Sequence, residues 1–269
     1  MKITLPDNSS RELPEGSSGY DLAKDIGPGL AKSAVAVTID GVQKDLNDVI
    51  NGDSKVSIIT IDSDEGIEIM RHTLTAQVLA RAIKNLYPKS KLAIGPTIQD
   101  GFYYDVESDV TISSDDLNKI EDEMKRIIKT KSSITKKLVS KSEAIKIFNS
   151  KKETYKEIII NESDQQDFQL YYQDDNEFVD MCLGPHLPNL EFIGSFKLTK
   201  ISGAYWKGDS NNSMLTRIYG TAFNNEKDLK NHLDNMEEAL KRDHRKLGKE
   251  MDLFHFQDEA PGMVFWHPN

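Results

Sequence analysis

Cysteine is almost absent from this chain: its 269 residues contain one, Cys182. A single thiol excludes an internal disulfide, so a cytoplasmic location is the simplest expectation. Long apolar runs are missing as well, since no stretch approaches the roughly 20 residues that span a membrane. The first residues, Met1 to Asp7, are typical of a strand entering a turn and not of a signal peptide. We therefore expect no membrane association.

Positive charge is in deficit. The chain has 34 Lys and Arg against 44 Asp and Glu, a formal net charge of -10. This argues against a surface coated uniformly for nucleic acid, because phosphate contacts need clustered cations. A local basic track remains open, and the densest run lies between Lys241 and Lys249. Such runs are more often solvated helix faces.

The composition, 38% hydrophobic and 29% charged, is that of a globular protein with room for two modest domains. Residues 1–62 predict a small β-rich domain. Its strands alternate with turn residues, Asp40-Gly41 is a favoured hairpin signal, and a short helix is expected from Tyr20 to Ile26. This order of hairpin, helix and further strands suits a β-grasp fold.

A second domain of the α+β class is predicted for residues 63–224. The acidic stretch Asp62 to Gly66 is interpreted as a linker. Apolar residues then recur at helical spacing through His72 toward Leu86, where Pro88 stops the helix. The fold class expected for the chain as a whole is therefore α+β.

The pattern beyond this helix predicts further strands and helices. Residues 91–98 and 101–106 favour a hairpin, and Ser113 offers the N-cap of an amphipathic helix. One apolar stripe on a highly charged segment predicts a connecting helix, assigned to residues 225–248. Residues 249–269 begin an element that the sequence does not finish.

Two separated segments concentrate the chemistry of the chain: Arg71 to Ala76 and Asp180 to His186. Together they hold two imidazoles and the only thiol, which is an active-site composition. Residues 72 and 76 share one face of a helix. The second of these positions is an alanine, Ala76, and this limits the chemistry that can be expected.

Several motifs, in order and spacing, give the chain a resemblance to the N-terminal half of bacterial threonyl-tRNA synthetases. The resemblance covers essentially the whole chain. It is carried by Ala93-Ile94-Gly95-Pro96, Gly101-Phe102-Tyr103-Tyr104-Asp105, Asp180 through Asn189, Gly203 through Asn212, Arg217-Ile218-Tyr219-Gly220-Thr221-Ala222 and Arg242-Asp243-His244-Arg245-Lys246.

The resemblance implies four parts. Residues 1–62 would be a ubiquitin-like TGS domain with the β-grasp fold, residues 63–224 an editing domain, residues 225–248 a linker helix, and residues 249–269 the entrance to a class II aminoacylation domain. It implies that ATP, Mg²⁺ and Zn²⁺ serve only that last, absent domain, so this chain alone is not expected to charge tRNA. No cofactor is expected for the editing region.

Energetics explain why such an enzyme needs a second site. Serine lacks only the methyl group of threonine, which is worth about 1 to 3 kcal/mol of discrimination. The remedy is a second pocket that hydrolyses the wrong ester. The resemblance thus implies hydrolysis of seryl-tRNA(Thr) to serine and tRNA(Thr), with tRNA(Thr) as the partner. The resemblance implies that the full-length enzymes are homodimers held mainly by the catalytic domain. A fragment without that domain could therefore be a monomer.

The resemblance implies catalytic roles for His72, Lys156, Cys182 and His186. A neutral imidazole at His72 orients or deprotonates the attacking water, since its reference pKa of about 6.5 leaves it mostly neutral at pH 7. Lys156 stabilises the oxyanion or holds the terminal ribose or phosphate. Cys182 and His186 bound the small pocket and position the water. The alternatives are a buried structural histidine, a solvated lysine, and a buried thiol beside a turn histidine.

Four residues are expected to bind the substrate. Asp180 would pair with the α-ammonium group of serine, or else cap a loop. Tyr104 would line the pocket or hydrogen-bond the terminal adenosine, although core packing is nearly as plausible. Trp206 and Arg217 combine an aromatic face with a cation, which suits stacking of a single-stranded acceptor end. Aromatic residues in strand patterns are, however, more often core.

Zinc is a further alternative, because the His and Cys pattern resembles the zinc site of alanyl-tRNA synthetase editing domains. A structural zinc site wants four ligands, and Ala76 removes one. Three ligands and water would still make a catalytic site. The threonyl family nevertheless points to metal-independent water activation, and we expect no metal.

Ala76 is expected to weaken editing, since a positioned acid or base contributes about 10² to 10⁴-fold. Gln77 points about 100 degrees away on an ideal helix and is a poor substitute. A rival interpretation is a non-catalytic tRNA-binding module with a degenerate editing site. A stand-alone editing factor is less favoured, because Phe254, Phe256, Val264 and Phe265 would lack their partners.

Overall fold

The chain is described here from a computed structural model that covers residues 1–174 and 178–268. It divides into two compact units, Met1–Asn224 and Asn225–Asn269. The candidate site lies wholly in the first unit. Within the described residues, no helix combines the length and apolar character needed to cross a bilayer.

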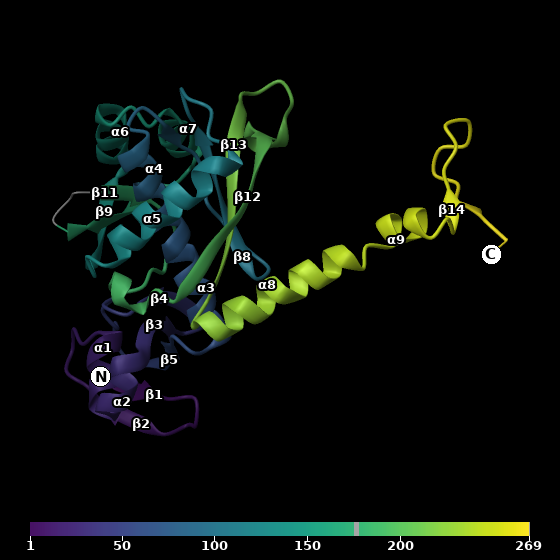
Figure 1. Cartoon of the computed structure of the whole chain (residues 1–269). Helices are drawn as coiled ribbons and strands as arrows, with labels where there is room; N and C mark the ends of the chain where they lie inside the picture. Colours follow the sequence, from purple (N-terminus) through teal and green to yellow (C-terminus); the bar gives the residue numbers. More distant parts are fainter. Residues whose placement is uncertain (175–177, 269) are drawn as a thin grey trace. The chain divides into compact units, whose positions relative to one another are not determined.

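The first 60 residues form a mixed five-stranded sheet with strand order β2-β1-β5-β3-β4, in which β1 and β5 run parallel (Figure 1). Asp40 and Gly41 join β3 to β4 with positive φ angles of 48° and 84°, as a tight hairpin turn requires. A capping box between Ser18 and Asp21 stabilises the N-terminus of helix α1, and Leu22 in this helix is fully buried. The elements are β1 (Lys2–Thr4), β2 (Ser10–Glu12), α1 (Gly19–Ile26), α2 (Pro28–Ser33), β3 (Ala34–Ile39), β4 (Val42–Asp45) and β5 (Ser54–Thr60).

One long helical stretch follows, made of α3 (Asp64–Thr73), a π-helical segment (Leu74–Leu79) and α4 (Ala80–Leu86). The predicted linker at Asp62 to Gly66 is wrong, because Ser63 caps a helix that already begins at Asp64. Gly66 allows this early start: a Cβ there would lie 2.0 Å from the Thr60 carbonyl oxygen. The end at Leu86, before Pro88, is as predicted.

Two sheets flank this helical stretch. The larger has the order β12-β13-β8-β6, with β7 paired to β8; the smaller is β11-β10-β9. The predicted strand at 91–98 is interrupted at Ala93 to Pro96, which leaves the two short strands β6 and β7. The strands are β6 (Lys91–Leu92), β7 (Thr97–Ile98), β8 (Gly101–Glu107), β9 (Ile134–Ser140), β10 (Asp167–Gln173), β11 (Phe178–Met181), β12 (Ser195–Tyr205) and β13 (Met214–Phe223).

The described part of the first unit also contains the helices α5 (Leu117–Ile128), α6 (Lys141–Ser150) and α7 (Thr154–Glu162), and short 3₁₀ helices at Ser114–Asp116, Leu190–Phe192 and Trp206–Gly208. Ser113 caps the start of the α5 region through a capping box with Asp116, as the sequence predicts. The largest apolar core joins α3, the π-helical segment and α5 to both sheets. It also includes Val35, Ala36 and Ile59 from the first 60 residues, so the core crosses the predicted boundary at residue 62.

The second unit holds α8 (Glu226–Lys241), α9 (His244–Glu250), β14 (Phe254–His255) and β15 (Phe265–Trp266). The single connecting helix predicted over residues 225–248 is wrong, because α8 ends at Lys241 and α9 begins three residues later, at His244. Cations of the basic run face acidic residues one turn away, such as Lys241 with Glu237, as expected of a solvated helix face.

Candidate active site

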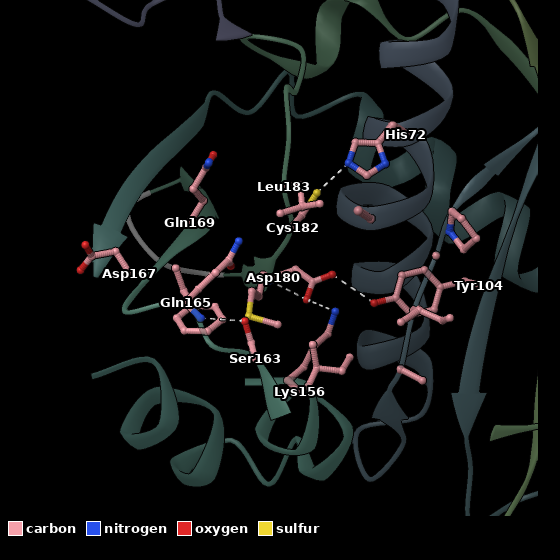
Figure 2. A pocket seen from close by; sticks show the side chains of 18 of the residues that line it. His72, Tyr104, Lys156, Ser163, Gln165, Asp167, Gln169, Asp180, Cys182 and Leu183 are labelled. Atoms are coloured by element: carbon pink, nitrogen blue, oxygen red, sulfur yellow. Dashed lines mark hydrogen bonds and ion pairs between the residues drawn. The ribbon is translucent and has the colours of Figure 1, made fainter. Parts of the chain in front are cut away.

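A cavity of about 530 Å³ opens between the helical stretch, the smaller sheet and α7 (Figure 2). Four elements supply its functional side chains: α3, β8, α7, and β11 with the residues after it. The π-helical segment contributes Ala76 to the wall. The reactive or buried polar residues at the cavity are His72, Tyr104, Lys156, Asp180 and Cys182. Ser163, Gln165, Asp167 and Gln169 also line the cavity (Figure 2).

His72 lies in the last turn of α3, directly before the π-helical segment. His72 and Ala76 both line the cavity, as the spacing of four predicts. Gln77 does not replace the missing histidine: its side chain is fully buried and accepts a hydrogen bond from Gln173 Nε2 at 3.0 Å. π-helical turns inside α-helices are frequent at functional sites.

Burial keeps the His72 imidazole neutral. Desolvation lowers the pKa of His72 below 6.5, and Lys156 adds to this effect, while Asp180 and Asp45 oppose it. The ring nitrogen Nε2 lies 2.6 Å from Cys182 Sγ. A neutral imidazole at pH 7 is the form that can accept a proton from water.

Cys182 follows directly after β11 and is held as a neutral thiol. Burial, the largest cause, raises the pKa of Cys182 to about 12. Its sulfur accepts a hydrogen bond from the Gly184 backbone N–H at 3.3 Å. Because the thiolate is the nucleophilic form, this environment is unsuited to covalent catalysis by Cys182. The thiol instead contacts His72 and forms part of the cavity wall.

Lys156 and Asp180 form a buried ion pair on the cavity wall, with Lys156 Nζ 2.7 Å from Asp180 Oδ1. Their side chains are 5% and 2% exposed. Tyr104 donates its hydroxyl to Asp180 Oδ2 at 3.0 Å, and the Met181 backbone N–H donates to Oδ1 at 2.8 Å. The two charges expected to meet the substrate separately are thus already paired with each other, and three donors surround the carboxylate.

His186 does not line the cavity, which corrects the expectation that it bounds the pocket with Cys182. Its buried ring stacks on His72, with ring centroids 4.7 Å apart and planes at 12°. Its Nδ1 lies 3.0 Å from the Thr73 hydroxyl oxygen. Burial holds the pKa of His186 well below 6.5, so this ring is a neutral support behind His72.

Trp206 and Arg217 also lie outside the cavity. The Trp206 ring is 8% exposed and packs edge-on against Tyr155, in a small core cluster that includes Leu215. A covered ring offers no face to a nucleotide, so the stacking role is not supported. Arg217 forms two 2.7 Å hydrogen bonds to Asp105 and lies 3.9 Å above the Tyr103 ring.

The residues expected to bind metal in the alternative interpretation do come together: one ligand atom each of His72, Cys182 and His186 lies within 4.8 Å of the others. Their orientation does not fit a shared ion. Imidazole lone pairs lie in the ring plane, and two rings stacked at 12° direct them side by side and not to one point. His72 Nε2 also contacts Cys182 Sγ directly. His186 Nε2 has no hydrogen-bond partner among the described residues.

Some residues at the site had no role in the sequence interpretation. Gly95 and Pro96 belong to the interruption between β6 and β7 and line the cavity, as do Met181 and Leu183. In the sequence, the Ala93 to Pro96 motif points only to the family resemblance. Asp45, at the end of β4, accepts a hydrogen bond from the His186 backbone N–H. No local signal marks a carboxylate at a strand end as part of a site 140 residues away.

Family models and curated relatives match this chain. Residues 1–60 match the family model of the TGS domain, and residues 169–219 match the threonyl and alanyl tRNA synthetase second additional domain. The chain is 49% identical over 268 residues to a threonine–tRNA ligase of Prochlorococcus marinus (strain MIT 9211), covering 99% of this chain and 42% of that protein. It is 50% identical over 266 residues to the threonine–tRNA ligase of Hahella chejuensis (strain KCTC 2396), covering 98% and 41%.

The fold and the matched models define a tRNA-synthetase region. In it, a TGS domain precedes the second additional domain of threonyl and alanyl tRNA synthetases. The chain corresponds to the N-terminal region of threonine–tRNA ligases. It spans about two fifths of the length of these relatives. The predicted family and the α+β fold class with a β-grasp TGS domain are confirmed, whereas the domain boundaries remain predictions.

Proposed function

We propose that this chain hydrolyses the ester bond of seryl-tRNA(Thr), releasing serine and tRNA(Thr). One observation carries the proposal: a single cavity holds the neutral His72 imidazole beside the buried Lys156–Asp180 pair. A base and a matched set of charges are what hydrolysis of an aminoacyl ester requires. The match to the threonyl and alanyl second additional domain supports this reading.

In the proposed reaction, water is the nucleophile. His72 takes a proton from the water as its oxygen attacks the ester carbonyl carbon. The bond between that carbon and the ribose oxygen then breaks, and the imidazolium returns the proton to the ribose oxygen as the hydroxyl leaves. Cys182 forms no covalent intermediate in this scheme, because a thiol with a pKa of about 12 stays protonated.

Lys156 and Asp180 would divide the charges of the substrate between them. The carbonyl oxygen becomes negative during attack, and the Lys156 ammonium group stabilises that charge. An ionised carboxylate has about four acceptor positions, and Asp180 uses three on Lys156, Tyr104 and the Met181 N–H, which leaves one for the α-ammonium group of serine. Tyr104 thereby orients the carboxylate.

Ala76 would make this hydrolase slow. The cavity wall at this position carries a methyl group in place of a second imidazole, and the Gln77 side chain is hydrogen-bonded to Gln173 and does not line the cavity. We expect Ala76→His to raise the deacylation rate, by at most about 10² to 10⁴-fold. Ala76→Gln, which adds volume without a base, is the matched control. An Ala76→His variant no faster than the parent would count against the role of this position.

The deciding experiment is single-turnover deacylation of seryl-tRNA(Thr) against threonyl-tRNA(Thr), with and without a zinc chelator. Serine-selective hydrolysis that resists chelation and is lost in His72→Ala would support the proposal. The second candidate, a tRNA-binding module with a lapsed site, is favoured by Ala76 alone. Binding of tRNA(Thr) without any hydrolysis would select it.

For the full-length protein we propose attachment of threonine to tRNA(Thr), the activity that the names of its relatives state. ATP, Mg²⁺ and Zn²⁺ would serve that reaction and not the cavity described above. A homodimer and a cytoplasmic location are part of the same proposal. Aminoacylation assays and gel filtration of the full-length protein test these points.

A further inference from the structure

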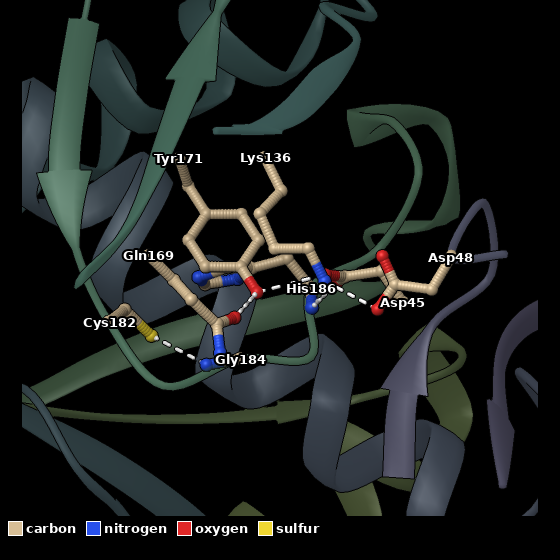
Figure 3. A network of polar contacts seen from close by, with 8 residues as sticks. All are labelled: Asp45, Asp48, Lys136, Gln169, Tyr171, Cys182, Gly184 and His186. Carbon is tan, nitrogen blue, oxygen red and sulfur yellow. Dashed lines mark hydrogen bonds and ion pairs between the residues drawn. The ribbon is translucent and has the colours of Figure 1, made fainter. Parts of the chain in front are cut away.

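The TGS domain reaches the loop of the candidate site through one carboxylate, Asp45, the last residue of β4 (Figure 3). Asp45 Oδ1 accepts a hydrogen bond from the His186 backbone N–H at 2.7 Å. Asp45 Oδ2 accepts another from the Tyr171 hydroxyl at 2.9 Å and lies 2.8 Å from Lys136 Nζ. Both oxygens of this side chain are thus bound to the editing region.

These contacts are largely withdrawn from water. The Asp45 side chain is 14% exposed, and Tyr171 is 1% exposed. Hydrogen bonds to an ionised carboxylate are roughly twice as strong as neutral ones, and low exposure preserves that strength. The contacts therefore fix the position of the backbone at His186 and of the Tyr171 hydroxyl.

Tyr171 in turn restricts the position of the middle of the loop. Its hydroxyl lies so close to Gly184 that a Cβ at this glycine would be 2.0 Å from the oxygen. Its ring also meets the His186 ring edge-on, with centroids 4.3 Å apart. The loop from Cys182 to His186 is therefore held at its middle and at its end.

The two ends of this loop are the two neighbours of His72. Cys182 Sγ contacts His72 Nε2, and the His186 ring stacks on the His72 ring. A shift of the loop moves both neighbours at once. Since a misplacement of about 1 Å can cost roughly 100-fold in rate, the position of this loop bears directly on His72.

We propose that Asp45 is a positioning residue for the candidate active site, and that the TGS domain thereby completes the editing site. Asp45 touches neither the cavity nor a substrate, and it acts through the Cys182–His186 loop. The part that concerns hydrolysis rests on the proposed function. The part that concerns the loop does not, because it can be read from the thiol of Cys182.

The chain offers a matched control in Asp48. This residue binds the same Lys136 Nζ from the same domain. Among the described contacts, its side chain makes none with the loop. Asp48→Ala therefore removes an equal charge at the same boundary and leaves the Asp45 contacts to His186 and Tyr171 intact.

The test compares Asp45→Ala, Asp45→Asn and Asp48→Ala in the whole 269-residue chain. Cys182 is the only cysteine, so the rate of alkylation by iodoacetamide reports the loop alone. We expect Asp45→Ala to raise this rate about tenfold, because a released loop exposes the thiol and eases its ionisation. Asp45→Asn keeps an acceptor for the His186 N–H and should restore most of the parent value.

Deacylation of seryl-tRNA(Thr) is the second readout. Asp45→Ala should lower the maximal single-turnover rate about 10 to 100-fold, while the half-saturating enzyme concentration and the melting temperature stay close to those of Asp48→Ala. Equal alkylation and equal rates in Asp45→Ala and Asp48→Ala would overturn the proposal.

Two further outcomes are separable. A parent chain that does not deacylate refutes the proposed function, and alkylation then decides the positioning role by itself. Should Asp45→Ala fail to fold, Tyr171→Phe removes the hydroxyl between Asp45 and Gly184. It is expected to raise alkylation several-fold over Asp48→Ala, and no rise would overturn the proposal.

Discussion

At the scale of single residues, the site is built from charges and rings that are removed from water and matched to one another. The Lys156–Asp180 pair is one such match, and both of its side chains are almost fully buried. A buried pair adds little net stability, because desolvation offsets the attraction. Removing one partner is costly, because it leaves the other charge buried and alone.

Lys156→Met should therefore destabilise the chain by about 3 to 5 kcal/mol. The double variant Lys156→Met with Asp180→Asn should be less destabilised than the sum of the two single variants. Urea unfolding of all four proteins provides the cycle. Lys89→Met is the control, because its partner Asp109 is solvent-exposed and such pairs are worth about 0 to 1 kcal/mol. Simple additivity would contradict a coupled buried pair.

The stacked histidines predict a pH dependence of stability. Burial lowers the pKa of both His72 and His186 in the folded state, so between that lowered value and 6.5 the unfolded chain binds more protons than the folded one. The contribution of these histidines to the free energy of unfolding is therefore fully present above pH 6.5 and is lost as the pH falls below this value. For His186 the loss between pH 7 and 5.5 should be about 1 kcal/mol.

Chemical unfolding at pH 7 and pH 5.5 measures this loss. His186→Phe keeps a ring against His72 but has no titratable group, so it should show a weaker pH dependence than the parent. An equal dependence in both proteins would assign the effect to other groups.

At the scale of elements, the segment from Ala93 to Pro96 closes one side of the cavity, and Gly95 is its critical position. A Cβ at Gly95 would lie 2.3 Å from the Tyr104 ring and 2.7 Å from Thr75 Cγ2. Tyr104 is fully buried and cannot move without leaving its hydrogen bond to Asp180.

Gly95→Ala should accordingly cost about 1 to 3 kcal/mol of stability and reduce deacylation. Gly29→Ala is the matched control: nothing lies within 4 Å of its Cβ position in α2, so a helix-favouring alanine there should be neutral or stabilising. Unfolding curves and single-turnover deacylation rates of both variants test this prediction. A Gly95→Ala protein as stable and active as Gly29→Ala would contradict the closed packing.

Elements with strong local signals could be predicted from the sequence. The Asp40-Gly41 turn supplies two positive φ angles, and Ser113 with Asp116 supplies a capping box, so each was placed correctly. The start of α3 was missed because acidic residues after Ser63 suit both a linker and a first helical turn. The π-helical segment was missed because its apolar pattern differs little from that of an α-helix.

The candidate site could likewise be predicted only in part from the sequence. His72, Tyr104, Lys156, Asp180 and Cys182 were predicted, and the structure gathers them at one cavity. His186 lies behind His72, and Trp206 is covered by Tyr155. The sequence does not predict these two positions, because both depend on packing between distant segments. The pairing of Lys156 with Asp180 likewise arises only when α7 meets β11.

At the scale of the whole molecule, the TGS domain and the editing region share one core. Val35, Ala36 and Ile59 of the first 60 residues belong to the same buried cluster as Met70 and Leu74. Asp45 adds polar contacts at the same boundary. The first 224 residues therefore form one compact unit, although two domain families are recognised within them.

This predicts how fragments behave. A chain of residues 1–224 should unfold in one cooperative transition, because the described core and cavity lie within it. A chain of residues 61–224 should melt at a lower temperature and bind a hydrophobic dye, since it exposes apolar surface that Val35, Ala36 and Ile59 cover. Calorimetry and dye fluorescence measure both properties. If residues 61–224 melted like residues 1–224 without binding dye, the shared core would carry little energy, and the TGS domain would be a separate module joined to the editing region by the chain alone.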